Sequence, residues 1–177
     1  MHLALKYPPR YTVEDYLKWE GNWELIEGIP YALASPSFKH QRVVGKIFRY
    51  LDEALEKECP YCVVGIDTDY IVSEDTVLRP DVFITCEEVG DNLLKPPNVV
   101  FEVISPSTRE KDEKLKKELY ENEGVPYLVL VYPDLTKARI YKLTEKGYKK
   151  IFDAVRDKFT FELKGCKVEF DFSKIWV

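Results

Sequence analysis

Residues 78–132 constrain the fold more than any other part of the sequence. They contain two apolar segments with β preference, 99–104 and 127–132, and a charged segment with helical periodicity, 108–123, lies between them. The second apolar segment has almost no polar residue, which is typical of a central strand that is buried on both faces. This order of strand, helix and strand predicts two parallel neighbouring strands that are joined by a helical crossover.

A single acid interrupts the first of these strands. The other residues of the segment are all apolar, namely Val99, Val100, Phe101, Val103 and Ile104. An unpaired charge inside a protein is costly or loses its ionisation. Glu102 therefore predicts a cationic partner, which is either a basic side chain or a metal ion.

The length and composition predict one domain that covers residues 1–177. A chain of 177 residues that is 45% hydrophobic can build one ordinary core, whereas two independent domains would be cramped. The charged fraction of 32%, with both signs spread along the chain, indicates solvated surfaces. A net charge of −5 argues against a protein that coats polyanions in general, but local basic patches would still allow nucleic acid to bind.

The sequence contains no targeting or membrane-spanning signal. The first twelve residues have no apolar core of signal-peptide length, and no segment approaches the roughly 18 apolar residues that a membrane span needs. We therefore expect a cytoplasmic protein that has no membrane partner. The four cysteines, Cys59, Cys62, Cys86 and Cys166, are too few and too irregularly spaced to indicate a secreted disulfide framework.

One cysteine pair, Cys59-Pro60-Tyr61-Cys62, has the letters of a glutaredoxin-type redox motif. A reactive dithiol of that kind lies at a helix N-terminus, whereas this pair is expected to follow a helix and precede a strand. A zinc site would need two further ligands, and the sequence has no second pair of that kind. A redox or metal function is therefore not the favoured interpretation here.

The remaining elements follow from periodicity and turn residues. The sequence predicts a short helix at 11–19 with Thr12 as its N-cap, a hairpin at 23–33, an amphipathic helix at 39–58, antiparallel strands at 63–72 and 77–85, and further strands at 139–143, 148–152 and 159–172. The long helix should cover one face of the sheet.

Asp81 and Glu102 have the chemistry of a magnesium site. This hard cation prefers oxygen ligands and keeps several waters, so one or two carboxylates from adjoining strands and a backbone carbonyl suffice to hold it. Such an ion lowers the pKa of a bound water and neutralises the charge that develops on a phosphoryl group. Asp81 and Glu102 meet this requirement if their strands pair.

A lysine near this site would complete the chemistry of phosphodiester hydrolysis. The residue two positions after Glu102, on the same face of the strand, is Ile104. On an α-helical wheel, Leu115 and Leu119 mark the inner stripe of the helix, Asp112, Lys116 and Tyr120 lie beside it, and Lys114, Lys117 and Glu121 point outward. Lys116 is therefore predicted to face the sheet and to bring its ammonium near Glu102.

These motifs together resemble the Uma-two family, a bacterial group of restriction endonucleases in the PD-(D/E)XK nuclease superfamily. The resemblance rests on 79–82 (RPDV), 101–108 (FEVISPST), the spacing of Asp112, Lys116 and Tyr120, and Gly124-Val125-Pro126 before an apolar strand. It extends upstream to 23–28 and His40 and downstream to the last strands. Nearly the whole chain is therefore covered.

The resemblance implies a restriction-endonuclease-like fold of the α/β (α+β) class, with a mixed central β-sheet that helices flank. It implies Asp81 and Glu102 as metal ligands with the Val103 carbonyl as a third, and Glu24 and His40 as assisting residues. The sequence departs from the superfamily at Ile104, where a lysine is usual, so Lys116 would take that role. The implied cofactor is Mg²⁺, which Mn²⁺ could replace, and the implied substrate is DNA. The oligomeric state stays open, with a homodimer as one option.

Other interpretations of the same residues stay open at this point. Glu102 could be the buried ion-pair partner of Lys116 or Arg79, Lys116 could extend to solvent, and Asp81 could be an ordinary turn residue. Glu24 could face solvent beside a hairpin turn, and His40 could pack locally at the start of a helix. The main functional hypothesis is a magnesium-dependent endonuclease that cleaves DNA. Its rivals are an inactive nuclease-fold module for DNA binding or assembly and, less favoured, a thiol oxidoreductase.

Overall fold

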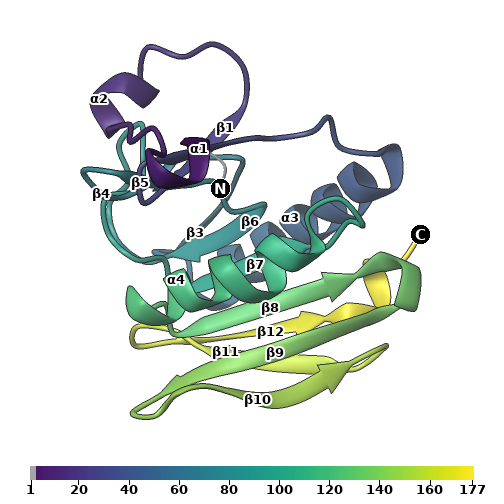
Figure 1. The fold of residues 1–177 in the computed structure, drawn as a ribbon. Helices are drawn as coiled ribbons and strands as arrows, with labels where there is room; N and C mark the ends of the chain where they lie inside the picture. The colour runs from purple at the N-terminus through teal and green to yellow at the C-terminus, as the bar shows by residue number, and fades with distance from the viewer. Residues whose placement is uncertain (1–2) are drawn as a thin grey trace.

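The computed structural model describes residues 3–177 and contains three β-sheets (Figure 1). The central six-stranded sheet has the order β10 (Gly147–Ala154), β9 (Lys137–Thr144), β8 (Tyr127–Tyr132), β7 (Val99–Val103), β6 (Val82–Thr85), β3 (Val63–Ile66). A four-stranded sheet has the order β2 (Ile29–Ala32), β1 (Trp23–Ile26), β5 (Thr76–Leu78), β4 (Tyr70–Ser73). The strands β11 (Lys158–Glu162) and β12 (Lys167–Asp171) form a separate hairpin.

The crossover predicted from residues 78–132 is present in the central sheet. Strands β7 and β8 are parallel neighbours, with Phe101 opposite Val129, and every residue of both strands is buried. The other neighbours in this sheet pair antiparallel. The sheet is therefore mixed, as expected.

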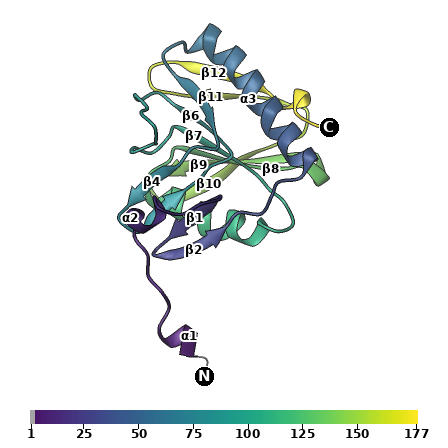
Figure 2. The ribbon, with the colours of Figure 1, turned by 90° about the horizontal axis from the view of Figure 1, so that it is seen from above.

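Helices and the β11–β12 hairpin cover the two faces of this sheet (Figure 2). The long helix α3 (Phe38–Glu58) begins one residue before its predicted start, and Ser37 caps it by accepting a hydrogen bond from the His40 N–H. Its buried face consists of Val43, Val44, Ile47, Leu51 and Leu55. This face packs with the β11–β12 hairpin on one side of the sheet. The crossover helix between β7 and β8 and the four-stranded sheet lie on the other side.

Two predicted strands are each broken in two, which corrects the sequence analysis. Residues 63–72 divide into β3 and β4 at Asp67, whose φ of 45° is left-handed and bends the chain. Residues 77–85 divide into β5 and β6 at 79–81, where Pro80 cannot donate a ladder hydrogen bond. The first segment thereby passes from the central sheet to the outer one, and the second returns from the outer sheet to the central one. Asp81 lies at this junction.

The crossover helix departs from the predicted regular α-helix. It consists of a π-helical segment, Lys111–Lys116, followed by α4 (Lys117–Asn122). Three polar side chains, Asp112, Lys116 and Tyr120, are its most buried residues, while Leu115 and Leu119 are only partly buried. The inner stripe is therefore rotated from the predicted leucines onto the polar residues beside them.

The helix predicted at 11–19 and the hairpin predicted at 23–33 are both present, although the helix is shorter than predicted. The helix α2 (Val13–Tyr16) begins after Thr12, which forms a capping box with Asp15. Strands β1 and β2 turn at Glu27-Gly28, where both residues have positive φ. A four-residue helix, α1 (Leu3–Lys6), precedes these elements.

All four cysteines form disulfides, which contradicts the expectation from their number and spacing. Cys59 bonds to Cys166, and Cys62 bonds to Cys86. Because Cys59 and Cys62 do not bond to each other, they do not form a redox dithiol. The bridges join the end of α3 to the β11–β12 hairpin and the start of β3 to the end of β6.

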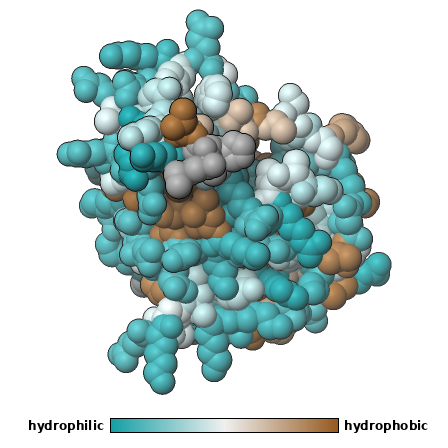
Figure 3. All heavy atoms as spheres, in the orientation of Figure 1, coloured by the Kyte–Doolittle hydropathy of each residue, from teal (hydrophilic) through white to brown (hydrophobic). Residues whose placement is uncertain are grey.

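The surface carries the charged residues, as the composition indicated. The face of the molecule seen in Figure 1 is mainly hydrophilic, especially over β9 and β10 (Figure 3). Within residues 3–177, no helix is long and apolar enough to cross a membrane.

Candidate active site

The two acids predicted as metal ligands lie on adjoining strands. Asp81 immediately precedes β6, and Glu102 lies in β7, which pairs antiparallel with β6 through Val82 and Phe101. The Val103 N–H donates a hydrogen bond of 2.7 Å to Asp81 Oδ2. The Asp81 carboxylate is therefore fixed against the end of β7, beside Glu102.

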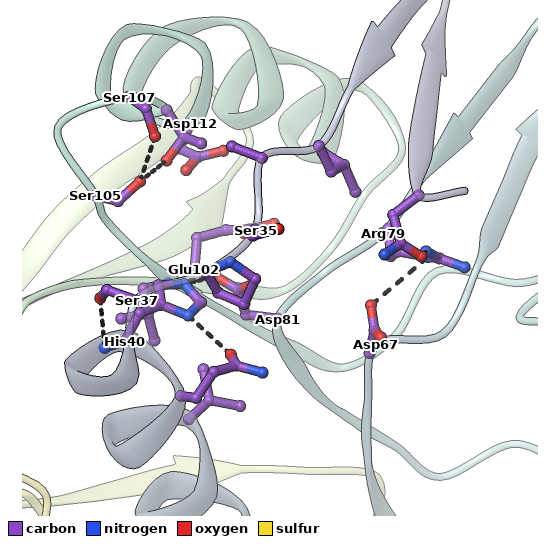
Figure 4. A pocket seen from close by; sticks show the side chains of 18 of the residues that line it. Ser35, Ser37, His40, Asp67, Arg79, Asp81, Glu102, Ser105, Ser107 and Asp112 are labelled. Atoms are coloured by element: carbon purple, nitrogen blue, oxygen red, sulfur yellow. Dashed lines mark hydrogen bonds and ion pairs between the residues drawn. The ribbon is translucent and has the colours of Figure 1, made fainter.

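Both acids face one cavity of about 570 Å³ (Figure 4). All the site residues that the sequence suggested line this cavity, namely Glu24, His40, Asp81, Glu102, Val103 and Lys116. Arg79, Lys111 and Asp112 line it as well, together with hydroxyl side chains from two loops, Ser35, Ser37, Ser105, Ser107 and Thr108. The fold thus brings the whole predicted set together.

Lys116 lies at the centre of the charged residues. Its Nζ is 2.7 Å from Glu102 Oε1, 2.9 Å from Glu24 Oε2 and 3.9 Å from Asp112 Oδ1. Lys116 is only 2% exposed, so the alternative in which its ammonium extends to solvent is wrong. The prediction that it approaches Glu102 is confirmed.

Glu24 is buried in the site, so it does not face solvent beside the hairpin turn. It is 1% exposed, and its Oε2 accepts a hydrogen bond of 2.8 Å from the Arg79 N–H as well as the contact from Lys116. Its Oε1 is 2.9 Å from Lys111 Nζ. Burial alone would raise the pKa of Glu24, but the ammonium groups of Lys116 and Lys111 lower it below its ordinary value.

Glu102 is held through one carboxylate oxygen by two partners. It is 2% exposed, and besides the ammonium of Lys116 its Oε1 accepts a 2.7 Å hydrogen bond from the Tyr120 hydroxyl. Burial raises the pKa of Glu102 well above its ordinary value, because the Lys116 ammonium only partly compensates for burial and for the neighbouring carboxylates of Asp81 and Asp112.

The Lys116 ammonium is held in its charged form. Burial alone would lower the pKa of Lys116, but the carboxylates of Glu102 and Glu24 outweigh this and raise it well above its ordinary value. Burial also raises the pKa of Asp112, the third acid near this ammonium.

His40 reaches the site from the first turn of α3. Its Nε2 is 3.5 Å from Asp81 Oδ2, and its Nδ1 is 3.0 Å from Gln41 Oε1. Burial alone would lower the pKa of His40, but hydrogen bonding to Asp81 and to the Val103 main chain raises it. His40 therefore touches two of the three groups that were predicted to hold a metal ion.

The charges that line the cavity do not balance. Five acidic side chains (Glu24, Asp67, Asp81, Glu102 and Asp112) and three basic ones (Arg79, Lys111 and Lys116) line it, so acids outnumber bases by two when His40 is neutral. Within residues 3–177, Asp81 Oδ1 and Glu102 Oε2 have no hydrogen-bond partner. Each predicted ligand thus has one oxygen bound by the protein and one available to an ion.

These donors fit a magnesium ion that is held largely by water. In the described part of the chain, no group of three or more His, Cys, Asp or Glu side chains is arranged to hold a metal. An ion here would therefore bind two carboxylates, the Val103 carbonyl and several waters. Mg²⁺ accepts such a set because it dehydrates reluctantly, whereas a structural zinc site needs more protein ligands.

A family model assigns the chain by its sequence. Uma2, described as "Putative restriction endonuclease", matches residues 13–158, which is most of the chain. The protein belongs to the Uma2 family. The resemblance to this family that the sequence motifs indicated is thereby confirmed. No match to the chain is found among the curated proteins.

A solved structure shares the fold of this Uma2 member. The crystal structure of a protein described as "a putative nuclease belonging to DUF820", from Anabaena variabilis, superposes with a TM-score of 0.71. The two sequences are 14% identical, and the match covers 88% of this chain and 90% of that one. The likeness supports the predicted restriction-endonuclease-like fold.

Sequence reasoning did not single out Lys111 as a residue of the Uma2 site, because the basic run 111–117 was expected to be mainly a solvated helix face whose lysines beside the cleft could contact phosphates. An α-helical wheel places Lys111 about 140° from Lys116, which is away from the sheet. It reaches Glu24 because the segment is π-helical, and the sequence carries no signal that we can identify for that change. Sequence reasoning also missed the hydroxyl residues of 35–37, and it included those of 105–108 only as part of the family motif. Their shared Ser-Pro-Ser pattern could have indicated two related loops.

Proposed function

We propose that this protein is a magnesium-dependent endonuclease that hydrolyses phosphodiester bonds of DNA. The observation that carries the proposal is the pair of acids, Asp81 and Glu102, that face one cavity from adjoining strands. Among the side chains that line this cavity, acids outnumber bases by two. Membership of the Uma2 family supports a nuclease, and the cavity residues supply groups that such chemistry needs.

In this proposal, Asp81, Glu102 and the Val103 carbonyl would hold the ion. A bound Mg²⁺ would lower the pKa of a water and offset charge on the phosphoryl oxygens. The Val103 N–H keeps the Asp81 carboxylate in place through Oδ2, and the Tyr120 hydroxyl does the same for Glu102 through Oε1. The protein therefore orients both ligands through one oxygen each and leaves the other available to the ion.

Lys116 takes the role of the superfamily lysine, whose usual position in the strand is occupied here by Ile104. Its ammonium is fixed between Glu24 and Glu102, so it can hold a water next to the metal ligands. His40 lies beside Asp81 Oδ2 and assists by accepting or donating a proton at the cavity wall. Glu24 assists by holding Lys116.

Cleavage assays with purified protein test this proposal. The wild-type protein is expected to cut DNA with Mg²⁺ or Mn²⁺, and Asp81→Ala and Glu102→Ala are expected to remove the activity. Glu53→Ala, which changes an exposed acid on α3, is the matched control and should cut as the wild type does. Calorimetric titration with Mg²⁺ gives a second readout, since binding should be lost in both site variants. A wild-type protein that is inert on DNA and RNA with several metals would refute the enzyme proposal.

A second candidate function is a nuclease-fold module that binds DNA or assembles complexes without catalysis. The ion pair of 2.7 Å between Lys116 and Glu102 favours it, because Glu102 then has a cationic partner without any metal. This candidate predicts DNA binding that needs no divalent ion and that persists in Glu102→Gln. The endonuclease predicts instead that Glu102→Gln weakens Mg²⁺ binding.

A further inference from the structure

The π-helical segment brings together two lysines that an α-helix would separate. Lys111 and Lys116 are five residues apart, and in an α-helix they would point about 140° away from each other. In a π-helix the backbone hydrogen bonds join residues five apart, so these two positions fall on nearly the same face. Both ammonium groups therefore reach Glu24, one at each carboxylate oxygen and each at 2.9 Å.

Both oxygens of Glu24 are used inside the protein. Oε1 contacts Lys111, while Oε2 contacts Lys116 and accepts the Arg79 N–H. Glu24 has one of the most buried side chains of the site. It therefore acts on the two lysines and is not a metal ligand.

The two lysines differ in what they can still bind. The ammonium of Lys116 contacts Glu24 and Glu102, and its side chain is 3% exposed. The Lys111 side chain is 15% exposed at the cavity, and in residues 3–177 its ammonium has one ion-pair partner. An ammonium has three N–H donors, so Lys111 keeps donors that can reach a ligand in the cavity.

The surroundings of Lys111 suit a phosphodiester backbone. Its ammonium lies 5.6 Å from the centre of the Tyr31 ring, which holds it by a cation–π contact without using an N–H donor. The same cavity wall carries the hydroxyls of Ser105 and Thr108, which are 3.0 Å apart. A charged donor beside neutral hydroxyls is a common arrangement for contacts to phosphate and sugar oxygens.

We propose that Lys111 binds a phosphate of the substrate strand next to the scissile one. Glu24 is the positioning residue that holds Lys111 beside Lys116, so that the contacted phosphate and the hydrolytic groups keep a fixed spacing. This inference rests on the proposed nuclease function and extends it, because the site then recognises the backbone of a nucleic acid strand.

The principal test compares Lys111→Met with Lys114→Met. Both changes remove one lysine charge from the same π-helical segment, but Lys114 is 76% exposed and contacts only Glu110 on the helix surface. Kinetics on an oligonucleotide would be measured at several salt concentrations. We expect Lys111→Met to raise KM about 10- to 100-fold, as the loss of a charged hydrogen bond does, and to lower kcat far less.

The salt dependence gives an independent readout of the same contact. Loss of one phosphate contact should reduce the slope of log(kcat/KM) against log[salt] by about 0.7 to 0.9. Lys111→Arg keeps the charge, so its KM should lie close to that of the wild type. Lys114→Met should match the wild type in both quantities.

Glu24→Gln tests the positioning role. It keeps the shape of the side chain but releases both lysines, so KM should rise and kcat should fall together. If Glu24 were only structural, the variant would show a lower Tm, while the folded fraction would keep wild-type kinetics and salt slope.

The outcomes separate this inference from the proposed function. If the wild type cuts DNA and Lys111→Met keeps the KM and salt slope of Lys114→Met, the role of Lys111 is refuted while the nuclease stands. If no protein cuts, the nuclease proposal fails, and binding of a labelled oligonucleotide decides the role of Lys111. Equal affinities of Lys111→Met and Lys114→Met would then refute it as well.

Discussion

The two faces of β7 use neighbouring residues for opposite purposes. On one face Phe101 packs edge-on against Phe161 and Phe170, with ring centres 5.9 and 5.7 Å away, in a wholly apolar cluster. On the other face, one residue along, Glu102 lies among buried charges. Burial of apolar surface stabilises the fold, whereas burial of charge costs free energy unless partners compensate. The comparison indicates that the Phe101 face serves stability alone, whereas the Glu102 face combines a second apolar cluster with the site.

The largest expected effect concerns the disulfide at the apolar face. Cys59–Cys166 spans 107 residues, and loss of this link in a Cys59→Ala/Cys166→Ala variant should lower the free energy of unfolding by about 5 kcal/mol, because the unfolded chain gains entropy. Cys62–Cys86 spans 24 residues, and its loss should cost about 3 kcal/mol. Urea unfolding of both variants measures the difference. Equal costs would show that loop closure does not explain how the bridges stabilise this face.

Next in size is the removal of the central cation from the polar face. Lys116→Met leaves Glu24 and Glu102 buried without their shared ammonium, which should cost about 3–5 kcal/mol at pH 7. In this variant the pKa values of both acids in the folded state should lie above their unfolded values. The folded state then binds protons more tightly, so stability should rise as the pH falls through the folded pKa values toward the unfolded value of about 4.3. Chemical unfolding between pH 4.5 and 8 measures this, and a flat profile would contradict it.

The smallest effect is a gain in stability. Because burial raises the pKa of Glu102 in the folded state, ionised Glu102 destabilises that state at neutral pH. Glu102→Gln should therefore raise the free energy of unfolding by about 1–2 kcal/mol at pH 7 in the presence of a chelator. The gain should shrink as the pH falls below the folded pKa, where the wild-type acid is also neutral. Thermal unfolding at two pH values checks it, and a loss of stability at pH 7 would show that the contact with Lys116 outweighs burial.

Local patterns were enough to predict the central part of the fold. The apolar run of β8, the helical period of α3 and the strand–helix–strand order around Glu102 each depend on residues close in sequence. The breaks at Asp67 and at 79–81 were not predicted, because a strand that changes sheets responds to distant partners. The disulfides were missed for a related reason, since spacing alone does not reveal pairing.

One residue made the predicted site visible in the sequence. Glu102 is a charged residue at a position where periodicity demands burial, so the sequence itself marks it as an exception, and Asp81 and Lys116 were identified as its expected neighbours. Lys111 carries no such mark on an α-helical wheel. It enters the cavity through a change of helical register, and its partner Glu24 lies 87 residues earlier in the chain.

Because the chain crosses between sheets just before Asp81, the cavity is assembled from different parts of the fold. Glu24 comes from the outer sheet, Glu102 from the central one and Lys116 from the crossover helix, and the Arg79 N–H ties the first of these to the junction. A partial opening that moves the outer sheet away would disperse the charge cluster while the apolar cluster between α3 and the central sheet stays intact. The proposed catalysis would then depend on the contact between the two sheets. It would be lost in local openings that cost far less free energy than unfolding of the whole molecule.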